Sequence, residues 1–192
     1  MTRMIRHALY AVLVFAAAGT ALGNSLVYKI TSGTVTFLAT GKPGFLRING
    51  EGGEPVGNFV MDAGHSKVTS GDITVHLDAF GTGLSLRDRH MKEKYLETKK
   101  FPDAIFKASP LAFKDGKLPG ETELKGTLTL HGLTNPLTAK VKVTAKQNLF
   151  EIEADFDILL SDFKIEIPEY AGVTVAEKVK VHTAFLTKIA KP

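Results

Sequence analysis

The sequence predicts an all-β protein, a closed antiparallel β-barrel of about eight strands with a short helix over residues 85–95. Long segments alternate apolar and polar residues with period two, as strands do in a sheet with one dry face and one wet face. The segment 150–160 is longer than a usual strand, and long twisted antiparallel strands tend to close because closure removes unpaired edges. The chain has no cysteine, so its core must hold the fold without disulfides.

The first segment has the pattern of a secretory signal peptide. Arg3 and Arg6 precede an apolar run over residues 9–18, and small residues at 21–23 suit a cleavage site. The apolar run is too short for a comfortable membrane span. We therefore expect residues 1–23 to be a signal peptide and residues 24–192 to form one domain. The protein should then be periplasmic or secreted, with no stable membrane span after cleavage.

The strands are expected in two groups. Five segments of β-type composition lie in the first half of the chain, at 27–30, 34–39, 45–49, 58–63 and 72–79. Glycine- and proline-containing turns at 41–44 and 51–55 separate some of them. Four segments with cleaner alternation follow, at 123–130, 136–145, 150–160 and 178–189, with turns expected at 115–116 and 134–136.

The segment expected to be helical breaks the period of two. It is charged, consists largely of good helix formers and lacks β-branched residues. Ser85 and Asp88 have the spacing of a capping box, and Met91 and Tyr95 are four residues apart on one face. Pro102 closes the segment, so we expect a short helix across the barrel or over one of its ends.

Alternation alone does not say which face of the sheet points inward. An outer-membrane barrel would turn its apolar face outward, but the polar faces here carry many Lys and Glu, and there is no Trp for an aromatic girdle. We therefore expect an apolar interior, which could hold a ligand or be filled by side chains. The large wall candidates are Phe37, Phe106, Phe150, Phe156 and Phe185. The small ones are Ala79, Ala139, Ala145 and Ala154.

Several short motifs occur in a fixed order. Arg87-Asp88-Arg89-His90-Met91 comes first, then Phe101-Pro102 and Phe106, then residues 126–132 (GTLTLHG) with Thr134, and finally Ser161-Asp162-Phe163. In this order they resemble the YceI-like family over essentially the whole chain from Tyr28 to Ile189. The resemblance implies an exported, lipocalin-like barrel with a long apolar pocket for polyisoprenoids or other amphiphilic lipids, including isoprenoid quinones. Leu160 departs from the family pattern, which has a basic residue there, and Lys164 stands where Gly or Asn is common.

The first functional hypothesis is an exported carrier that buries a long amphiphilic lipid, bound non-covalently, against the five Phe wall candidates. Arg87 and His90 are the candidates for head-group contact, although Arg87 with Asp88 could instead pin the helix to the barrel rim. One alternative is a filled barrel that acts as an envelope stress or interaction protein without a ligand. The other is a hydrolase using Asp88, His90 and His131. The chain could also form a homodimer.

Other classes of function are not expected. The sequence has no zinc-protease, nucleophile-elbow, phosphate-loop or dinucleotide motif, so we expect no enzyme and no covalent cofactor. No nucleic-acid partner is expected, because basic residues are interspersed with acids. No metal site is expected either, although His76 and Asp78 share a strand face. We expect His131 to stabilise a turn, and His65 and His182 to be surface residues without partners.

Overall fold

The computed structural model describes residues 25–42, 46–146, 149–170 and 173–190. The predicted signal peptide at 1–23 and part of the predicted turn at 41–44 lie outside the described residues. The strands are β1 (Ser25–Lys42), β2 (Arg47–Glu51), β3 (Val56–Asp62), β4 (Lys67–His76), β5 (Asp103–Ala108), β6 (Leu111–Ala112), β7 (Glu121–Leu130), β8 (Leu133–Lys146), β9 (Leu149–Leu159), β10 (Glu169–Tyr170) and β11 (Val173–Ile189). The helical elements are η1 (Leu77–Ala79), α1 (Ser85–His90), the single π turn η2 (Met91–Tyr95), η3 (Lys114–Gly116) and η4 (Leu160–Phe163).

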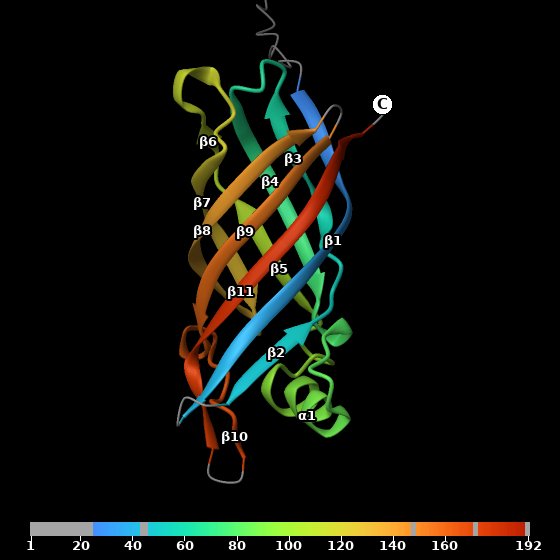
Figure 1. The fold of residues 1–192 in the computed structure, drawn as a ribbon, viewed down its shortest axis with the longest axis vertical. Coiled ribbons are helices and arrows are strands. Elements are labelled where there is room, and N and C mark those ends of the chain that lie inside the picture. The colour runs from blue at the N-terminus through green and yellow to red at the C-terminus, as the bar shows by residue number, and fades with distance from the viewer. Residues whose placement is uncertain (1–24, 43–45, 147–148, 171–172, 191–192) are drawn as a thin grey trace, which may run out of the picture.

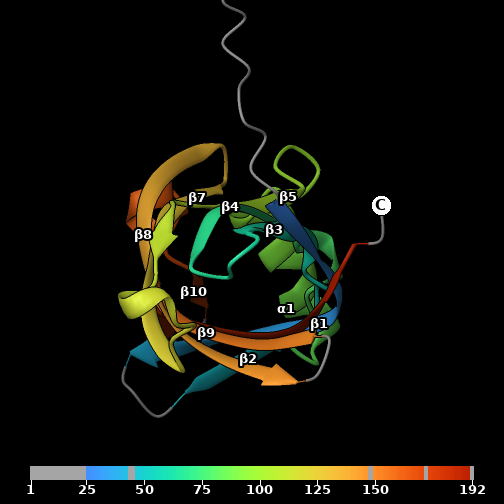
Figure 2. The same cartoon turned by 90° about the horizontal axis from the view of Figure 1, so that it is seen from above.

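Eight of the described strands close into an antiparallel barrel (Figures 1 and 2). Their order around the barrel is β11-β9-β8-β7-β5-β4-β3-β1, and β1 pairs back with β11 along most of its length. The closed path leaves none of these strands as a free edge, which is the physical reason for closure. The predicted fold class is confirmed.

Strand β1 is one strand where the sequence suggested two, at 27–30 and 34–39. Its pairing with β11 shifts register between Ile30 and Ser32, as a β-bulge does. Before the shift Tyr28 and Ile30 are buried, whereas after it Val35 and Ala39 are buried, so the inward set moves from even to odd positions. The prediction was wrong here because an extra residue changes the phase of the alternation without ending the strand.

The β7–β8 connection also differs from the prediction. Residues 134–136 were expected to form a turn, but they lie within β8, where Asn135 pairs with Leu128. Leu130 pairs with Leu133, so the turn consists of His131 and Gly132, with φ of 50° and 76°. Two positive φ values are typical of the tight hairpin turn that matches the twist of the strands. Strand β5 was not predicted, because its apolar residues do not alternate cleanly.

The predicted helix is present as α1 and η2, but the predicted capping box is not. The residue before α1 is Leu84, and no side chain caps it. The Asp88 carboxylate turns back to Thr82 instead. Figure 1 shows α1 at the same end of the barrel as β2 and β10, with β6 at the other end. No helix among the described residues is long and apolar enough to cross a membrane.

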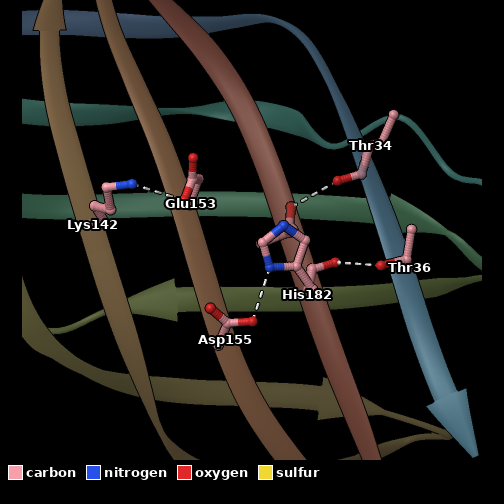
Figure 3. A network of polar contacts seen from close by, with 7 residues as sticks. Thr34, Thr36, Lys142, Glu153, Asp155 and His182 are labelled. Atoms are coloured by element: carbon pink, nitrogen blue, oxygen red, sulfur yellow. Dashed lines mark hydrogen bonds and ion pairs between the residues drawn. The ribbon is translucent and has the colours of Figure 1, made fainter.

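The outer face of the barrel carries charge pairs between neighbouring strands. Lys146 and Lys178 pair with Glu151 and Asp157 at 2.6 and 3.2 Å. Lys142 Nζ lies 3.5 Å from Glu153 Oε2, and His182 Nδ1 lies 2.8 Å from Asp155 Oδ1. Figure 3 shows both contacts. The expectation that His182 lacks a partner is therefore wrong. The orientation of the sheet, polar outward and apolar inward, is as predicted.

Lys164 gives a stability prediction. It ends η4 in the left-handed region, with φ 52° and ψ 30°, where a side chain carries a steric cost. We expect Lys164→Gly to raise the free energy of unfolding by roughly 0.5–1 kcal/mol, because glycine adopts this conformation without that cost. Lys164→Ala keeps the strain and should give no gain. Urea unfolding of the two variants compares them, and an equal gain in both would contradict the explanation.

Candidate functional site: the barrel lumen

The barrel encloses a cavity of about 790 Å³ that runs through both of its hydrophobic clusters. One cluster surrounds Tyr28, Phe59 and Phe185, and the other surrounds Phe80 and Phe163. Strand β8 has 14 residues. At ~3.3 Å per residue and a tilt of about 40°, such a strand spans roughly 35 Å of the barrel axis. The interior is therefore long, narrow and hollow, and side chains do not fill it.

All seven candidate site residues line this cavity. They are Phe37, Phe106, Phe150, Phe156, Phe185, Arg87 and His90. Their roles as ligand contacts remain predictions. Of the four small candidates, Ala139 and Ala154 line the cavity, whereas Ala79 and Ala145 are exposed and their placement in the lumen was wrong. Ala79 lies in η1, after β4 has ended, and Ala145 lies near the end of β8.

Phe106 keeps its place in the wall because its neighbour has no side chain. Ala108 of β5 pairs with Gly126 of β7, and the Phe106 ring lies against Gly126. A Cβ at residue 126 would lie 2.6 Å from Phe106 Cζ and 2.3 Å from the Lys107 carbonyl oxygen. This close approach explains why a glycine opens the motif at 126–132.

The polar part of the lining is concentrated at the α1 end of the barrel. Ser85, Arg87 and His90 line the cavity on one side there, and Glu169 lines it on the other. His90 and Glu169 are exposed as well, so the lumen meets solvent between them. An ion pair of 3.6 Å between Lys94 Nζ and Glu166 Oε2 links the two sides. We call this opening the mouth.

Thr82 fastens α1 to the rim of the mouth. Arg87 donates from Nε to Thr82 Oγ1 and from Nη2 to the Thr82 carbonyl oxygen, each at 2.7 Å. The Thr82 backbone N–H and its hydroxyl donate to Asp88 Oδ1, the former at 2.7 Å. Gly81 pairs with Glu51 of β2, which extends the attachment to the sheet. Arg87 and Asp88 therefore pin the helix, and Arg87 still has further N–H donors.

This clamp predicts a dependence of stability on pH. Hydrogen bonds from Thr82 hold the pKa of Asp88 below its ordinary value of 3.8. A lowered pKa in the folded state stabilises the protein fully above the ordinary value, and this stability is lost as pH falls through the lowered pKa. Asp88→Asn should cost about 1 kcal/mol at pH 7, and the difference from the parent should shrink below pH ~4. Thermal unfolding between pH 7 and 3 measures this stability difference, with Asp72→Asn at an exposed residue as the control. A difference between Asp88→Asn and the parent that stays constant with pH would contradict the prediction.

The opposite end of the lumen is closed in part by an aromatic group. Tyr28 lines the cavity and its hydroxyl lies 2.6 Å from His65 Nε2, while its ring packs 4.9 Å from that of Phe150. Burial raises the pKa of Tyr28. The expectation that His65 has no partner is therefore wrong. Asp62 holds the turn that contains His65, because its carboxylate accepts hydrogen bonds from the backbone N–H groups of Ser66 and Lys67 at 2.9 and 2.6 Å.

The three residues of the hydrolase hypothesis do not share one site. His90 lines the cavity, whereas Asp88 and His131 are absent from its lining. His131 lies 3.0 Å (Nδ1) from the Phe163 carbonyl oxygen and 2.8 Å (Nε2) from Glu97 Oε2. Both of its ring nitrogens are thus engaged in joining the β7–β8 turn to η4 and to the segment after η2.

The pair His76 and Asp78 was the weak candidate for a metal site. His76 and Asp78 do not act together, because His76 Nδ1 lies 2.6 Å from Asp103 Oδ1 and Asp78 accepts from Thr98 at 3.3 Å. The described part of the chain holds no group of three or more His, Asp or Glu suited to a metal ion.

Sequence reasoning missed two parts of the site. Thr82, which carries the clamp, precedes the helix and belongs to no alternating segment. Leu46, directly before β2, and Ile48 of β2 line the cavity near the mouth, as do Val173 and Val175 of β11. The β-type composition of 45–49 indicated a strand there. It could not indicate that the strand pairs with the far end of β1 and flanks the opening.

A closed antiparallel barrel with a long apolar lumen defines a small class of binding folds. The sequence of residues 28–185 matches the family model of the YceI-like domain, so the chain belongs to the YceI-like family. A UPF0312 protein of Enterobacter sp. (strain 638) is 30% identical over 116 residues, which cover 57% of this chain and 58% of that protein. The chain thus spans less than two thirds of the length of this curated relative.

Two solved structures share the fold. BcnA of Burkholderia cenocepacia superposes with a TM-score of 0.67 at 18% identity, covering 80% of this chain and 95% of BcnA. A polyisoprenoid binding domain from Saccharophagus degradans superposes with a TM-score of 0.64 at 14% identity, covering 86% of this chain and 99% of that domain. At these identities the likeness concerns the fold alone.

Proposed function

We propose that the protein is an exported carrier that sequesters one long amphiphilic lipid, a polyisoprenoid or an isoprenoid quinone, in its lumen. The observation that carries this proposal is the apolar cavity of about 790 Å³ that runs through the barrel. This volume lies in the range of sites that bury most of a drug-sized ligand. The shared fold with the polyisoprenoid binding domain from Saccharophagus degradans supports the same ligand class.

Burial of the lipid tail supplies the affinity. A prenyl chain has no hydrogen-bonding group, so an apolar tube satisfies it, at about 0.8 kcal/mol for each carbon group buried. Phe37 would contact the tail in the half nearer the mouth, and Phe150, Phe156 and Phe185 in the other half, with Phe106 between them. The tail is held without a covalent bond, and no catalytic group is needed.

The mouth would hold the polar head of the lipid. His90 is exposed at the mouth, and Arg87 has donors beyond those that Thr82 uses. A diphosphate or a quinone oxygen accepts hydrogen bonds from such groups. Leu160 lines the cavity where the family commonly has a basic residue, so the cationic contacts to a head group would come from the α1 side.

Lipid extraction and native mass spectrometry of the protein from its own compartment test the proposal. We expect a co-purifying isoprenoid lipid, or binding of added undecaprenol or ubiquinone by the emptied protein. Absence of both results would overturn the proposal. A barrel that acts without a ligand has less support, because the lumen is hollow. A hydrolase has less support because His90 lines the cavity, whereas Asp88 and His131 bind partners away from it.

A further inference from the structure

We infer that the α1 side of the mouth docks on the surface of an anionic lipid bilayer. This inference rests on the proposed lipid-carrier function and says where the lipid enters and leaves. Such a lipid has little solubility in water, so its shortest route runs from the bilayer through the mouth into the lumen. The residues around the mouth have the chemistry that this contact requires.

The apolar lining of the lumen continues onto the outer surface at α1. Leu84 and Leu86 both line the cavity, yet they are 58% and 47% exposed. Leu86 and His90 are four residues apart on one helix face, and both line the cavity while exposed. Across the mouth, Ile167 is 40% exposed beside Glu166, which the ion pair with Lys94 holds near η2. Apolar side chains thus stand at the opening with no covering element described.

The charge around these leucines complements an anionic surface. The segment 84–100 holds six cationic residues and three acids, a net charge of +3. Arg89 is exposed and lies three residues after Leu86 on the same helix. The segment 162–169 on the other side of the mouth holds three acids, Asp162, Glu166 and Glu169, and one cation, Lys164, a net charge of −2. The positive α1 side is therefore the side that would meet the bilayer.

Other macromolecular partners fit these residues less well. A protein partner would cover the mouth and block the lumen, whereas a bilayer presents its own lipid to it. Exposed leucines with neighbouring cations are typical of segments that lie in a membrane interface. The contact would be weak and reversible, because few apolar side chains insert, and this suits a carrier that must leave the membrane.

Vesicle flotation tests the docking surface. The exported protein should float with vesicles of phosphatidylcholine and phosphatidylglycerol in equal amounts, weakly with phosphatidylcholine alone, and less as salt is added. Arg89→Glu should weaken binding by roughly twentyfold, because it removes one cation and adds one anion, and each unit of charge near an anionic surface changes binding about fivefold. Lys117→Glu, an exposed reversal in the η3–β7 connection at the other end, should leave flotation unchanged.

A second pair of variants tests the apolar contribution. Leu86→Ser should weaken flotation about tenfold, whereas Val56→Ser, at a residue that is also 47% exposed, should not. Equal loss in Arg89→Glu and Lys117→Glu, or equal flotation with both kinds of vesicle, would overturn the docking surface. Binding of ubiquinone in solution separates the two proposals. If the protein binds ubiquinone but does not float, the docking surface is refuted and the carrier function is not. If the protein floats but binds no lipid, the carrier function is refuted.

Discussion

Ala139→Phe is expected to reduce binding of undecaprenol or ubiquinone by about 100-fold or more. Ala139 is 4% exposed, lies on the inner face of β8 and lines the cavity among the residues of the Tyr28 cluster. A phenyl ring there would occupy the narrow lumen that the lipid tail needs, and the tail would lose the burial of several carbon groups, each worth about 0.8 kcal/mol. The ring enters existing space, so the fold should tolerate it better than it would in a filled core.

The adjacent residue provides a matched control. Thr138 precedes Ala139 in β8 and points outward, so Thr138→Phe adds the same ring to the outer face. It should bind lipid as the parent does. Isothermal titration, or quenching of tyrosine fluorescence by added ubiquinone, measures the lipid affinity of both variants. Thermal unfolding shows whether each variant is folded. If a folded Ala139→Phe protein binds with unchanged affinity, the lipid does not lie in the lumen.

The inner wall was the part of the site best predicted from sequence. Alternation in 150–160 assigned Phe150, Ile152, Ala154, Phe156, Ile158 and Leu160 to one face, and all six line the cavity. This worked because β9 keeps a regular register with both β8 and β11. Where the register shifts, as in β1 after Ile30, the alternation changes phase, and the sequence suggested two strands in place of one.

The mouth was harder to predict, because contacts between distant segments define it. The clamp on Thr82 needs residues of α1 and the loop before it to fold back together, and no periodic pattern marks such a loop. Likewise, Asp88 has capping-box spacing from Ser85, yet hydrogen bonds to Thr82 satisfy it. Spacing identified Asp88 as a polar anchor but could not identify its partner. Partners of His65, His76 and His182 were missed for the same reason.

His131→Ala is expected to lower the free energy of unfolding by about 2–3 kcal/mol. The imidazole is 12% exposed, its two nitrogens lie within hydrogen-bond distance of the Phe163 carbonyl and Glu97, and its ring centroid lies 4.6 Å from that of Phe101. Truncation leaves the partly buried Phe163 carbonyl and Glu97 short of a partner and removes an aromatic contact. Three segments would be released at once: the β7–β8 turn, η4 and the residues that follow η2.

Two further variants separate the side-chain effect from other causes. His76 also lies beside a carboxylate, at 2.6 Å from Asp103, but its side chain is 64% exposed, so His76→Ala should cost less than about 1 kcal/mol. Asparagine at residue 131 tolerates the positive φ of this turn but cannot reach both partners. The variant His131→Asn should therefore lose about as much free energy of unfolding as His131→Ala. Urea unfolding compares the three proteins. If His131→Asn keeps the parent stability, the backbone of the turn matters and the imidazole bridge does not. If folded His131→Ala binds lipid with an affinity close to that of the parent, the histidine has a structural role outside the lumen.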